Sequence, residues 1–391
     1  MLTPRTARRS VRKRRHACAA APPRTSMPRV SPPCPPRPCA AARAHHADPG
    51  LPARHPIREP LAASLHAVQR EDDRRARRPI LKRCNLRRDA FAASTSHAFI
   101  AMDLTKKTVK AKRPCADGFR WFVRNHHNGG DYQELLDALV ADGRVDDACW
   151  LLDQFGPTDA VLELDELDAD ALVFAGSVHV RGGVEVGSVL RTGRTLRVGG
   201  SIRAGRAVTT GEDITVAGGI RCAGSVQCGG DLKAGWHVEA DEAIRCGGEL
   251  RAGWELRCGG PLALGGNTTV GHDLVAHGTV RCARSLRVGG ALTGADSIHA
   301  AQGIESGGAI RCGMHLEAGW GIRSGEAIVA EGAIKAGESL FARQEIRAGA
   351  GYGVYAGLDV RVDAWEASAQ VHAGMRPEGL MSGWWGGAAL A

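Results

Sequence analysis

The chain has 391 residues, 43% of them hydrophobic, and a formal net charge of +9 at pH 7. It contains neither the apolar core of a secretory signal nor a run of about 18 apolar residues, so we expect no transmembrane segment. Residues 1–101 hold 22 of the 51 Lys and Arg but 6 of the 42 Asp and Glu, which leaves the remainder net acidic. That acidic balance argues against nucleic-acid binding by residues 102–391.

Residues 1–101 are predicted to be disordered. They hold 14 of the 18 prolines and show no hydrophobic period, so they cannot bury enough apolar surface to become ordered. Three interpretations remain open: upstream sequence translated by mistake, with Met102 as the true start; an Arg-rich organelle-targeting peptide; or a basic arm for nucleic acid or a membrane. A solvated tail is the simpler alternative to the basic arm.

Residues 102–165 are predicted to form a small helical domain. Asp131 and Glu134 indicate a capping box at the start of one helix, which Gly143 ends. A second helix is expected from about Val145 to Gly156, and a third, rich in aromatic residues, at 118–123. The side chains expected to point inward are Leu135, Leu136, Leu139, Val140, Ala148, Cys149, Leu152 and Phe155. We expect this head to cap the first coil of the next domain, to recruit a partner, or both.

From Ala171 to Ala350 the chain repeats every six residues, thirty times without an insertion. The second residue of each hexad is Leu, Ile or Val in 29 of 30 cases, the fourth is almost always small, and the fifth is Gly in 19. The second and fourth side chains share one face of a short strand, and Gly at the fifth position allows a corner with positive φ or a tight turn. The pattern predicts an all-β fold, a parallel β-solenoid (β-helix).

We expect about three hexads, or 18 residues, in each coil of a solenoid that spans residues 166–362. Coils of two hexads are the alternative. Two features favour three: five of the six Val residues at the fourth position share one register modulo 18, and Trp236 and Trp254 lie 18 residues apart, so that their rings are expected to stack.

Half of the 12 cysteines follow the repeat. All six occupy the fourth position of a hexad, where other hexads place Ala, and we expect them to pack in the core as small hydrophobic residues. A disulfide between Cys228 and Cys246, in adjacent coils, is the alternative. Buried free thiols are typical of a reducing compartment and favour a cytoplasmic protein. The six are Cys222, Cys228, Cys246, Cys258, Cys282 and Cys312.

Residues 363–391 are predicted to be a C-terminal cap or tail, because Ala364 and Gln370 fall where the repeat requires an inward aliphatic side chain. The tryptophans of this segment predict either a lid folded back on the last coil or an exposed docking patch. With two aromatic residues of the head, they are the candidate interaction residues: Trp121, Phe122, Trp365, Trp384 and Trp385.

No catalytic, cofactor or metal site is predicted. His126 and His127 follow Cys115 without a second ligand pair at zinc spacing. His272 and His277 lie at neighbouring corners, where isolated histidines are the alternative to a catalytic or metal pair. The acidic residues of 165–170 predict a hydrated linker before the first coil. Twelve Arg occupy the outward third position, and the register spreads them over all three faces, which argues against a basic stripe.

The hexads, of which 243–248 is typical, resemble those of two families. They resemble the bactofilins, bacterial cytoskeletal proteins, and this resemblance implies a triangular β-helix that stacks end to end into filaments. A weaker resemblance is to the hexapeptide-repeat acyltransferases. In those enzymes the small inward residue precedes the aliphatic one and a loop carries a catalytic His, so no catalytic residue of this chain follows from the resemblance.

We therefore expect a non-enzymatic, cytoplasmic, bactofilin-like scaffold that associates with itself or with a protein partner. A protein-binding module of effector or phage type, acting through the head and the aromatic tail, is the alternative. An acyltransferase with a site between subunits is a further alternative. No cofactor and no small-molecule substrate are expected.

Overall fold

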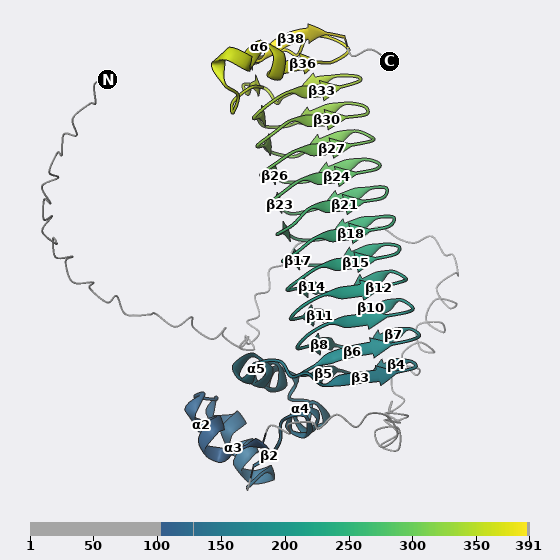
Figure 1. The fold of residues 1–391 in the computed structure, drawn as a ribbon, viewed down its shortest axis with the longest axis vertical. Helices are drawn as coiled ribbons and strands as arrows, with labels where there is room; N and C mark the ends of the chain where they lie inside the picture. The colour runs from purple at the N-terminus through teal and green to yellow at the C-terminus, as the bar shows by residue number, and fades with distance from the viewer. Residues whose placement is uncertain (1–102, 128, 389–391) are drawn as a thin grey trace, which may run out of the picture. The chain divides into compact units, whose positions relative to one another are not determined.

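The computed structural model describes residues 103–127 and 129–388. The expectations for residues 1–101 lie outside this part of the chain. Helices α2 to α5 form a small head that precedes the solenoid, and three parallel sheets then run side by side to the C-terminal end (Figure 1). None of the helices in the described residues has the length and apolar character needed to cross a membrane.

The all-β solenoid predicted from the hexads is confirmed. The sheets surround one continuous hydrophobic core, and successive strands of the chain pass from one sheet to the next. Ile202 pairs with Ile220 and Ile220 with Val238, so each regular coil has 18 residues and contributes one strand to each sheet. The predicted coil of three hexads is therefore confirmed over the regular part of the column.

We call the sheets the first, second and third faces. The first face has 11 strands: β4 (Leu167–Ala169), β7 (Val184–Val186), β10 (Ile202–Ala204), β13 (Ile220–Cys222), β16 (Val238–Ala240), β19 (Leu256–Cys258), β22 (Leu274–Ala276), β25 (Leu292–Gly294), β28 (Ile310–Cys312), β31 (Ile328–Ala330) and β34 (Ile346–Arg347). The second face has 12: β5 (Leu172–Phe174), β8 (Val189–Thr192), β11 (Ala207–Thr210), β14 (Ser225–Cys228), β17 (Ile244–Cys246), β20 (Leu262–Leu264), β23 (Val280–Cys282), β26 (Ile298–Ala300), β29 (Leu316–Ala318), β32 (Ile334–Ala336), β35 (Val354–Tyr355) and β37 (Leu380–Ser382). The third face has 13: β3 (Val161–Leu164), β6 (Ser177–Val180), β9 (Leu196–Val198), β12 (Ile214–Val216), β15 (Leu232–Ala234), β18 (Leu250–Ala252), β21 (Thr268–Val270), β24 (Leu286–Val288), β27 (Ile304–Ser306), β30 (Ile322–Ser324), β33 (Leu340–Ala342), β36 (Gln370–His372) and β38 (Trp384–Gly387).

Of the two reasons predicted for glycine at the fifth hexad position, a positive φ is wrong and a tight corner remains. The described residues with positive φ lie outside the thirty hexads, so these corners do not need the left-handed conformation. The close approach between coils explains the preference: a Cβ at Gly253 would lie 2.0 Å from the carbonyl oxygen of Gly235 in the preceding coil. Glycine at this position thus lets the corners of successive coils stack in contact.

The six cysteines of the repeat are buried, as predicted, and they are also hydrogen-bonded. Cys228 Sγ donates to the corner carbonyls of Glu212 at 3.0 Å and Asp231 at 3.1 Å. Thr210 and Ser324 occupy the same hexad position and donate to corner carbonyls in the same way. A Cys, Thr or Ser side chain at the fourth hexad position therefore donates a hydrogen bond to a corner carbonyl group. The prediction that the cysteines act only as small hydrophobic residues did not include this role.

Both predicted boundaries of the solenoid are wrong. The column begins at Val161, which pairs with Ser177, so the residues expected to form an acidic linker belong to the first coil. It continues to Gly387, because β36, β37 and β38 in the predicted tail extend the second and third faces. The first and last coils deviate from 18 residues, as in the pairing of Leu340 with Val371, which explains why the hexad pattern does not reveal them.

The head contains four helices: α2 (Lys106–Ala111), α3 (Ala116–Asn125), α4 (Tyr132–Ala141) and α5 (Val145–Phe155). Asp131 accepts hydrogen bonds from the backbone N–H groups of Gln133 and Glu134 at the start of α4, and Gly143 follows its end with positive φ. The third predicted helix is longer than expected, and α2 was not predicted. A two-stranded pairing of β1 (Asp103–Leu104) with β2 (Gly130–Asp131) closes the head.

The head is fastened to the solenoid by apolar and polar contacts. Val173 in β5 and Ala175 just after it are buried in the hydrophobic core of the head. Gln133 of α4 donates to the carbonyl oxygen of Val173 at 3.1 Å and accepts from the N–H of Ala175 at 2.9 Å. Arg206 of the solenoid pairs with Asp146 of α5 at 3.1 Å. The head thus covers the first strand of the second face.

Candidate functional site

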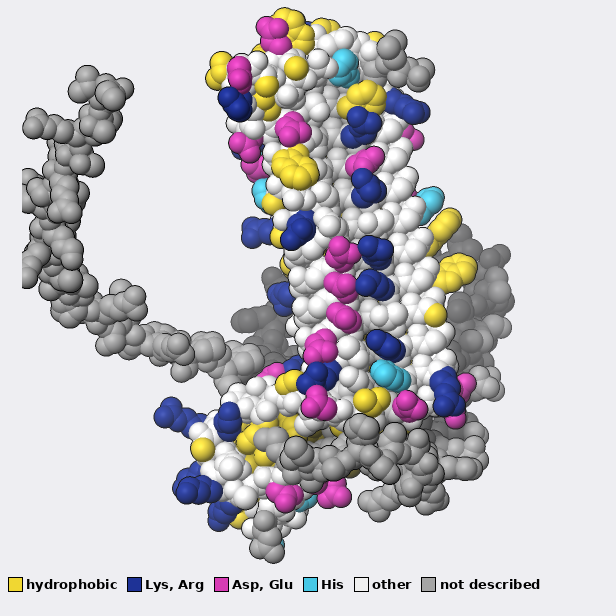
Figure 2. Space-filling model, viewed as in Figure 1, with side chains coloured by type: hydrophobic (Ala, Val, Ile, Leu, Met, Phe, Trp, Pro, Cys, Tyr) yellow, Lys and Arg dark blue, Asp and Glu magenta, His cyan; other side chains and the backbone are white. Residues whose placement is uncertain are grey.

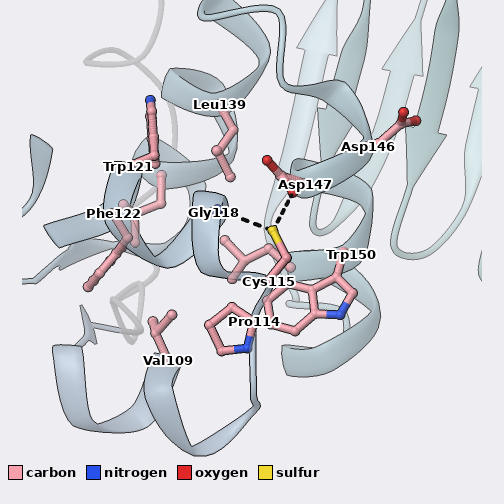
Figure 3. Close-up of a pocket in the computed structure, with 12 residues that line it drawn as sticks. Val109, Pro114, Cys115, Gly118, Trp121, Phe122, Leu139, Asp146, Asp147 and Trp150 are labelled. Atoms are coloured by element: carbon pink, nitrogen blue, oxygen red, sulfur yellow. Dashed lines mark hydrogen bonds between the residues drawn. The ribbon is translucent and has the colours of Figure 1, made fainter. Parts of the chain in front are cut away.

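A cavity of about 180 Å³ opens among the helices of the head (Figure 3). Its wall is mostly apolar, with two carboxylates at one side. The lining residues are Val109, Pro114, Cys115, Gly118, Trp121, Phe122, Leu135, Leu139, Asp146, Asp147, Trp150 and Leu151. A space of this size and character can take an apolar side chain of a partner protein.

The Cys115 thiol lies at the mouth of this cavity and caps helix α3. Its Sγ accepts a hydrogen bond from the N–H of Gly118 at 3.1 Å and donates to Asp147 Oδ1 at 3.8 Å, and Figure 3 shows both contacts. Asp147 is also paired with Arg144 at 2.5 Å. These contacts give Cys115 a structural role at the start of the helix.

The two candidate interaction residues of the head differ in exposure. Trp121 is half-buried, and its Nε1 donates to Asp142 Oδ2 at 2.6 Å. Phe122 is buried with 4% of its surface exposed, so the expectation that it lies on the outside of the head is corrected. Phe122 lies three positions after Phe119, on the same side of α3, and both pack in the head core. The rings of Trp121 and Phe122 also line the cavity.

The three candidate tryptophans of the C-terminal segment lie at the other end of the solenoid. Trp365 begins the short helix α6 (Trp365–Ser368), which follows η2 (Val362–Ala364), and is half-buried. Trp384 and Trp385 are neighbours in β38 and therefore point to opposite sides. Trp384 is exposed, whereas Trp385 packs against the solenoid core. The five candidate residues thus lie at the two ends of the column, two in the head and three in the C-terminal segment, as their positions in the sequence indicate.

Exposed apolar side chains are concentrated at the C-terminal end. Figure 2 shows several of them gathered there, at the top of the column, while the face in view carries mixed charges. Six of the eleven exposed large hydrophobic residues lie between residues 352 and 384: Tyr352, Leu358, Val362, Met375, Met381 and Trp384. The strands β34, β37 and β38 also end the three sheets here.

Three further exposed tryptophans lie at the corners of the column. Trp236, Trp254 and Trp320 occupy the sixth hexad position and are each about half exposed or more. The predicted stacking of Trp236 on Trp254 is replaced by a stack of Trp254 on His272, with ring centroids 4.7 Å apart and planes 15° apart. Tryptophan at a corner position is the signal in the sequence that marks these residues as surface candidates.

The two histidines considered as a catalytic or metal pair do not lie together in the described residues. His272 and His277 lie at opposite ends of strand β22, so they do not form a pair, and His272 contacts Asp273 at 3.0 Å. In this part of the chain no cluster of three or more His, Cys, Asp or Glu side chains could hold a metal ion. The outward Arg residues of the hexads are distributed over all three faces, as the register predicted.

Cys228 and Cys246 are Cα partners in adjacent coils. The neighbouring Cys228 thiol and burial together raise the pKa of Cys246 above the ordinary thiol value. The eight cysteines that the structure describes are all free thiols.

Comparison with known protein families gives a match to the head. Residues 102–155 match the family model of the YdhT N-terminal domain. No curated protein and no solved structure matches the chain. The match covers α2 to α5 and the cavity between them, so the head is similar to a domain that occurs as the N-terminal part of other proteins.

Proposed function

We propose that this protein is a non-enzymatic scaffold, similar to the bactofilins, in which a rigid β-solenoid associates end to end through its C-terminal end. The observation that carries the proposal is the difference between the two ends of the column. At the N-terminal end, α4 covers the first strand of the second face. At the C-terminal end, three edge strands lie among exposed apolar side chains.

Edge strands and exposed apolar side chains are the two features that promote association between β-proteins. Along the regular coils, by contrast, the outward side chains are mostly charged, and some of them pair between coils, as Arg221 does with Glu239 at 2.7 Å and Arg287 with Glu305 at 2.9 Å. These features support association at the end of the column in preference to its faces.

Electron microscopy and light scattering of the full chain test this proposal. We expect rods joined at one end, and we expect Met381→Glu to abolish the junction by placing a charge in the apolar patch. Met381 is 68% exposed, so the substitution leaves the core intact. Met314→Glu, at an exposed corner of the column, is the matched control. Discrete monomers at high concentration, or junctions that survive Met381→Glu, would contradict the proposal.

The cavity in the head favours a second function, that of a protein-binding module. A partner would insert an apolar side chain among the rings of Trp121, Phe122 and Trp150. Leu139→Phe narrows the cavity, so it should abolish capture of such a partner, with circular dichroism checking that the head remains folded despite the larger side chain. At the C-terminal end, Trp384→Ala tests partner binding, because Trp384 is exposed. Replacing Trp385 would also disturb the core, against which it packs. Capture that is unaffected by either variant would exclude this function.

The cytoplasm is the proposed location. The eight described cysteines are free, and six of them are buried in the solenoid core, which suits a reducing compartment.

A further inference from the structure

One corner of the column carries a row of residues, one from each of seven successive coils, that are joined by backbone hydrogen bonds. The row lies where the third face turns into the first. Each N–H donates to the carbonyl oxygen one coil earlier, as from Trp254 to Trp236 at 3.0 Å and from His272 to Trp254 at 2.7 Å. The row is Gly200, Gly218, Trp236, Trp254, His272, Gly290 and Gly308. Because the bonds are continuous, these residues are evenly spaced by about 4.8 Å, the separation of neighbouring strands.

The three central residues of the row have large aromatic side chains, and the residues on either side of them are glycines. Trp236 and Trp254 are 64% and 54% exposed, and His272 is stacked on Trp254. The two coils on either side of this group present glycine at the same position. Large aromatic side chains therefore project from three coils, whereas glycine occupies the same position above and below them, with the Asp273 carboxylate lying beside Gly290.

We propose that this corner, which we call the tryptophan corner, binds the same corner of a second copy with the two columns antiparallel. A twofold axis that passes through the coil of His272 brings Trp254 opposite the bare corner at Gly290 of the second copy. The same operation brings Trp236 opposite Gly308. Both projecting rings then meet a corner without a side chain, and such self-complementary contacts are typical of twofold dimers.

The charges beside the tryptophan corner fit the same register. The operation brings Glu239 of the first face opposite Arg311, and Lys233 of the third face opposite Glu305. Val275 comes to lie on the axis, facing its own copy. Like charges also meet: Arg251 comes opposite Arg287 and, farther along the first face, Arg203 comes opposite Arg347. Asp273 faces its own copy. Arg251 and Arg287 are each already paired with a glutamate of their own chain, at 3.1 and 2.9 Å.

A register with the axis through Trp236 fits less well. It places the largest side chain against itself and brings Glu239 opposite its own copy. It also brings Arg257 opposite Arg221 on the first face. Like charges that face each other across an interface weaken association, so the axis through His272 is favoured.

The size of the contact indicates a weak dimer. Two tryptophans exposed by about half contribute roughly 250 Å² per copy, on the order of a third of the 800 Å² that each partner buries in a standard interface. Dimers should therefore appear at high protein concentration and separate on dilution. This contact involves the side of the column and does not depend on the proposed association at its end.

Sedimentation velocity of the full chain carrying Met381→Glu tests the proposal, because that change removes any association through the C-terminal end. We expect a monomer–dimer equilibrium that Trp254→Ala weakens by about tenfold or more. Trp320→Ala is the matched control: Trp320 is 49% exposed at the same hexad position, on a different corner, and its loss should leave the equilibrium unchanged. Equal dimer dissociation constants for the Trp254→Ala and Trp320→Ala proteins would overturn the proposal. A protein that stays monomeric at all concentrations would also overturn it.

A charge exchange tests the antiparallel register. Glu239→Arg should weaken the dimer, because it places an arginine opposite Arg311 of the second copy. Adding Arg311→Glu to the same chain should restore the dimer by making the pair opposite in charge again. A double variant that dimerises as weakly as Glu239→Arg alone would overturn this register.

Discussion

Gln133 in helix α4 accepts a hydrogen bond from the backbone N–H of Ala175, immediately after β5, at 2.9 Å, and its side-chain nitrogen donates to the carbonyl oxygen of Val173. One side-chain amide thus provides the donor and the acceptor that a preceding strand would otherwise offer. The edge of the second face ends at this amide, which explains how a helical head terminates a parallel sheet.

Replacing Gln133 by Ala should lower the free energy of unfolding by about 1–3 kcal/mol, because two part-buried backbone groups of the first coil lose their partners. Urea unfolding followed by circular dichroism measures the change. Gln227→Ala, on the outer side of the same face, is the control and should change stability by less than about 0.5 kcal/mol. Equal effects of the two substitutions would show that the amide does not support the edge.

Ile244→Asp should unfold the column, because it places an unpaired carboxylate in a core position with 0% exposure. The neighbouring Arg245→Asp puts the same side chain on the outer side of β17 and should cost less than about 0.5 kcal/mol. Expression as soluble protein and thermal melting distinguish the two. A folded Ile244→Asp protein with an unchanged melting temperature would refute the inward assignment of the second hexad position.

Gly253→Ala should destabilise the column by roughly 1–3 kcal/mol, because the new Cβ would overlap the carbonyl oxygen of Gly235 and force the coils apart. Gly183→Ala is the control: a Cβ there would lie 3.7 Å from the nearest atom outside its own chain neighbours, the carbonyl oxygen of Ser201, so the change should be neutral or slightly stabilising. Chemical denaturation of both variants provides the comparison. Similar losses at the two sites would argue against close approach as the reason for glycine.

Stability should fall as the pH rises above about 9. Burial raises the pKa of Cys258 and Cys312 above the ordinary thiol value, so in the folded chain they stay protonated where the unfolded chain ionises. Their contribution is complete below the ordinary thiol pKa and is lost at higher pH, by up to about 1.4 kcal/mol per pH unit for each thiol. Urea unfolding at pH 8 and pH 10 should show a smaller decrease for Cys258→Ala/Cys312→Ala than for the unchanged chain. Equal decreases would indicate that other groups dominate.

The hexad repeat predicted the regular coils because every hexad places the same kinds of side chain at its inward and corner positions. Ile244 and Cys246 lie inward where their positions in the hexad place them. The first and last coils were missed because insertions and deletions shift the strands out of the six-residue phase while parallel pairing continues, as between Val354 and Leu380. Hydrogen bonding, which the side-chain pattern does not encode, defines these coils.

The candidate interaction residues were predicted less well than the fold. Aromatic residues that are adjacent in the sequence suggest a common patch, but Trp384 and Trp385 alternate along a strand and only one of them is exposed. Helix α2 was missed because it is six residues long and buries only Val109. The stack of Trp254 on His272 depends on side-chain rotamers, for which the spacing of residues carries no information.

The uniform coil makes the length of the column adjustable in equal steps. Every regular coil pairs with its neighbours in the same register over 18 residues, so removing or duplicating one such unit rejoins matching strands on all three faces. Each step changes the separation of the helical head from the aromatic end by about 4.8 Å and leaves both ends intact. The number of coils thus sets the distance between the helical head and the C-terminal end.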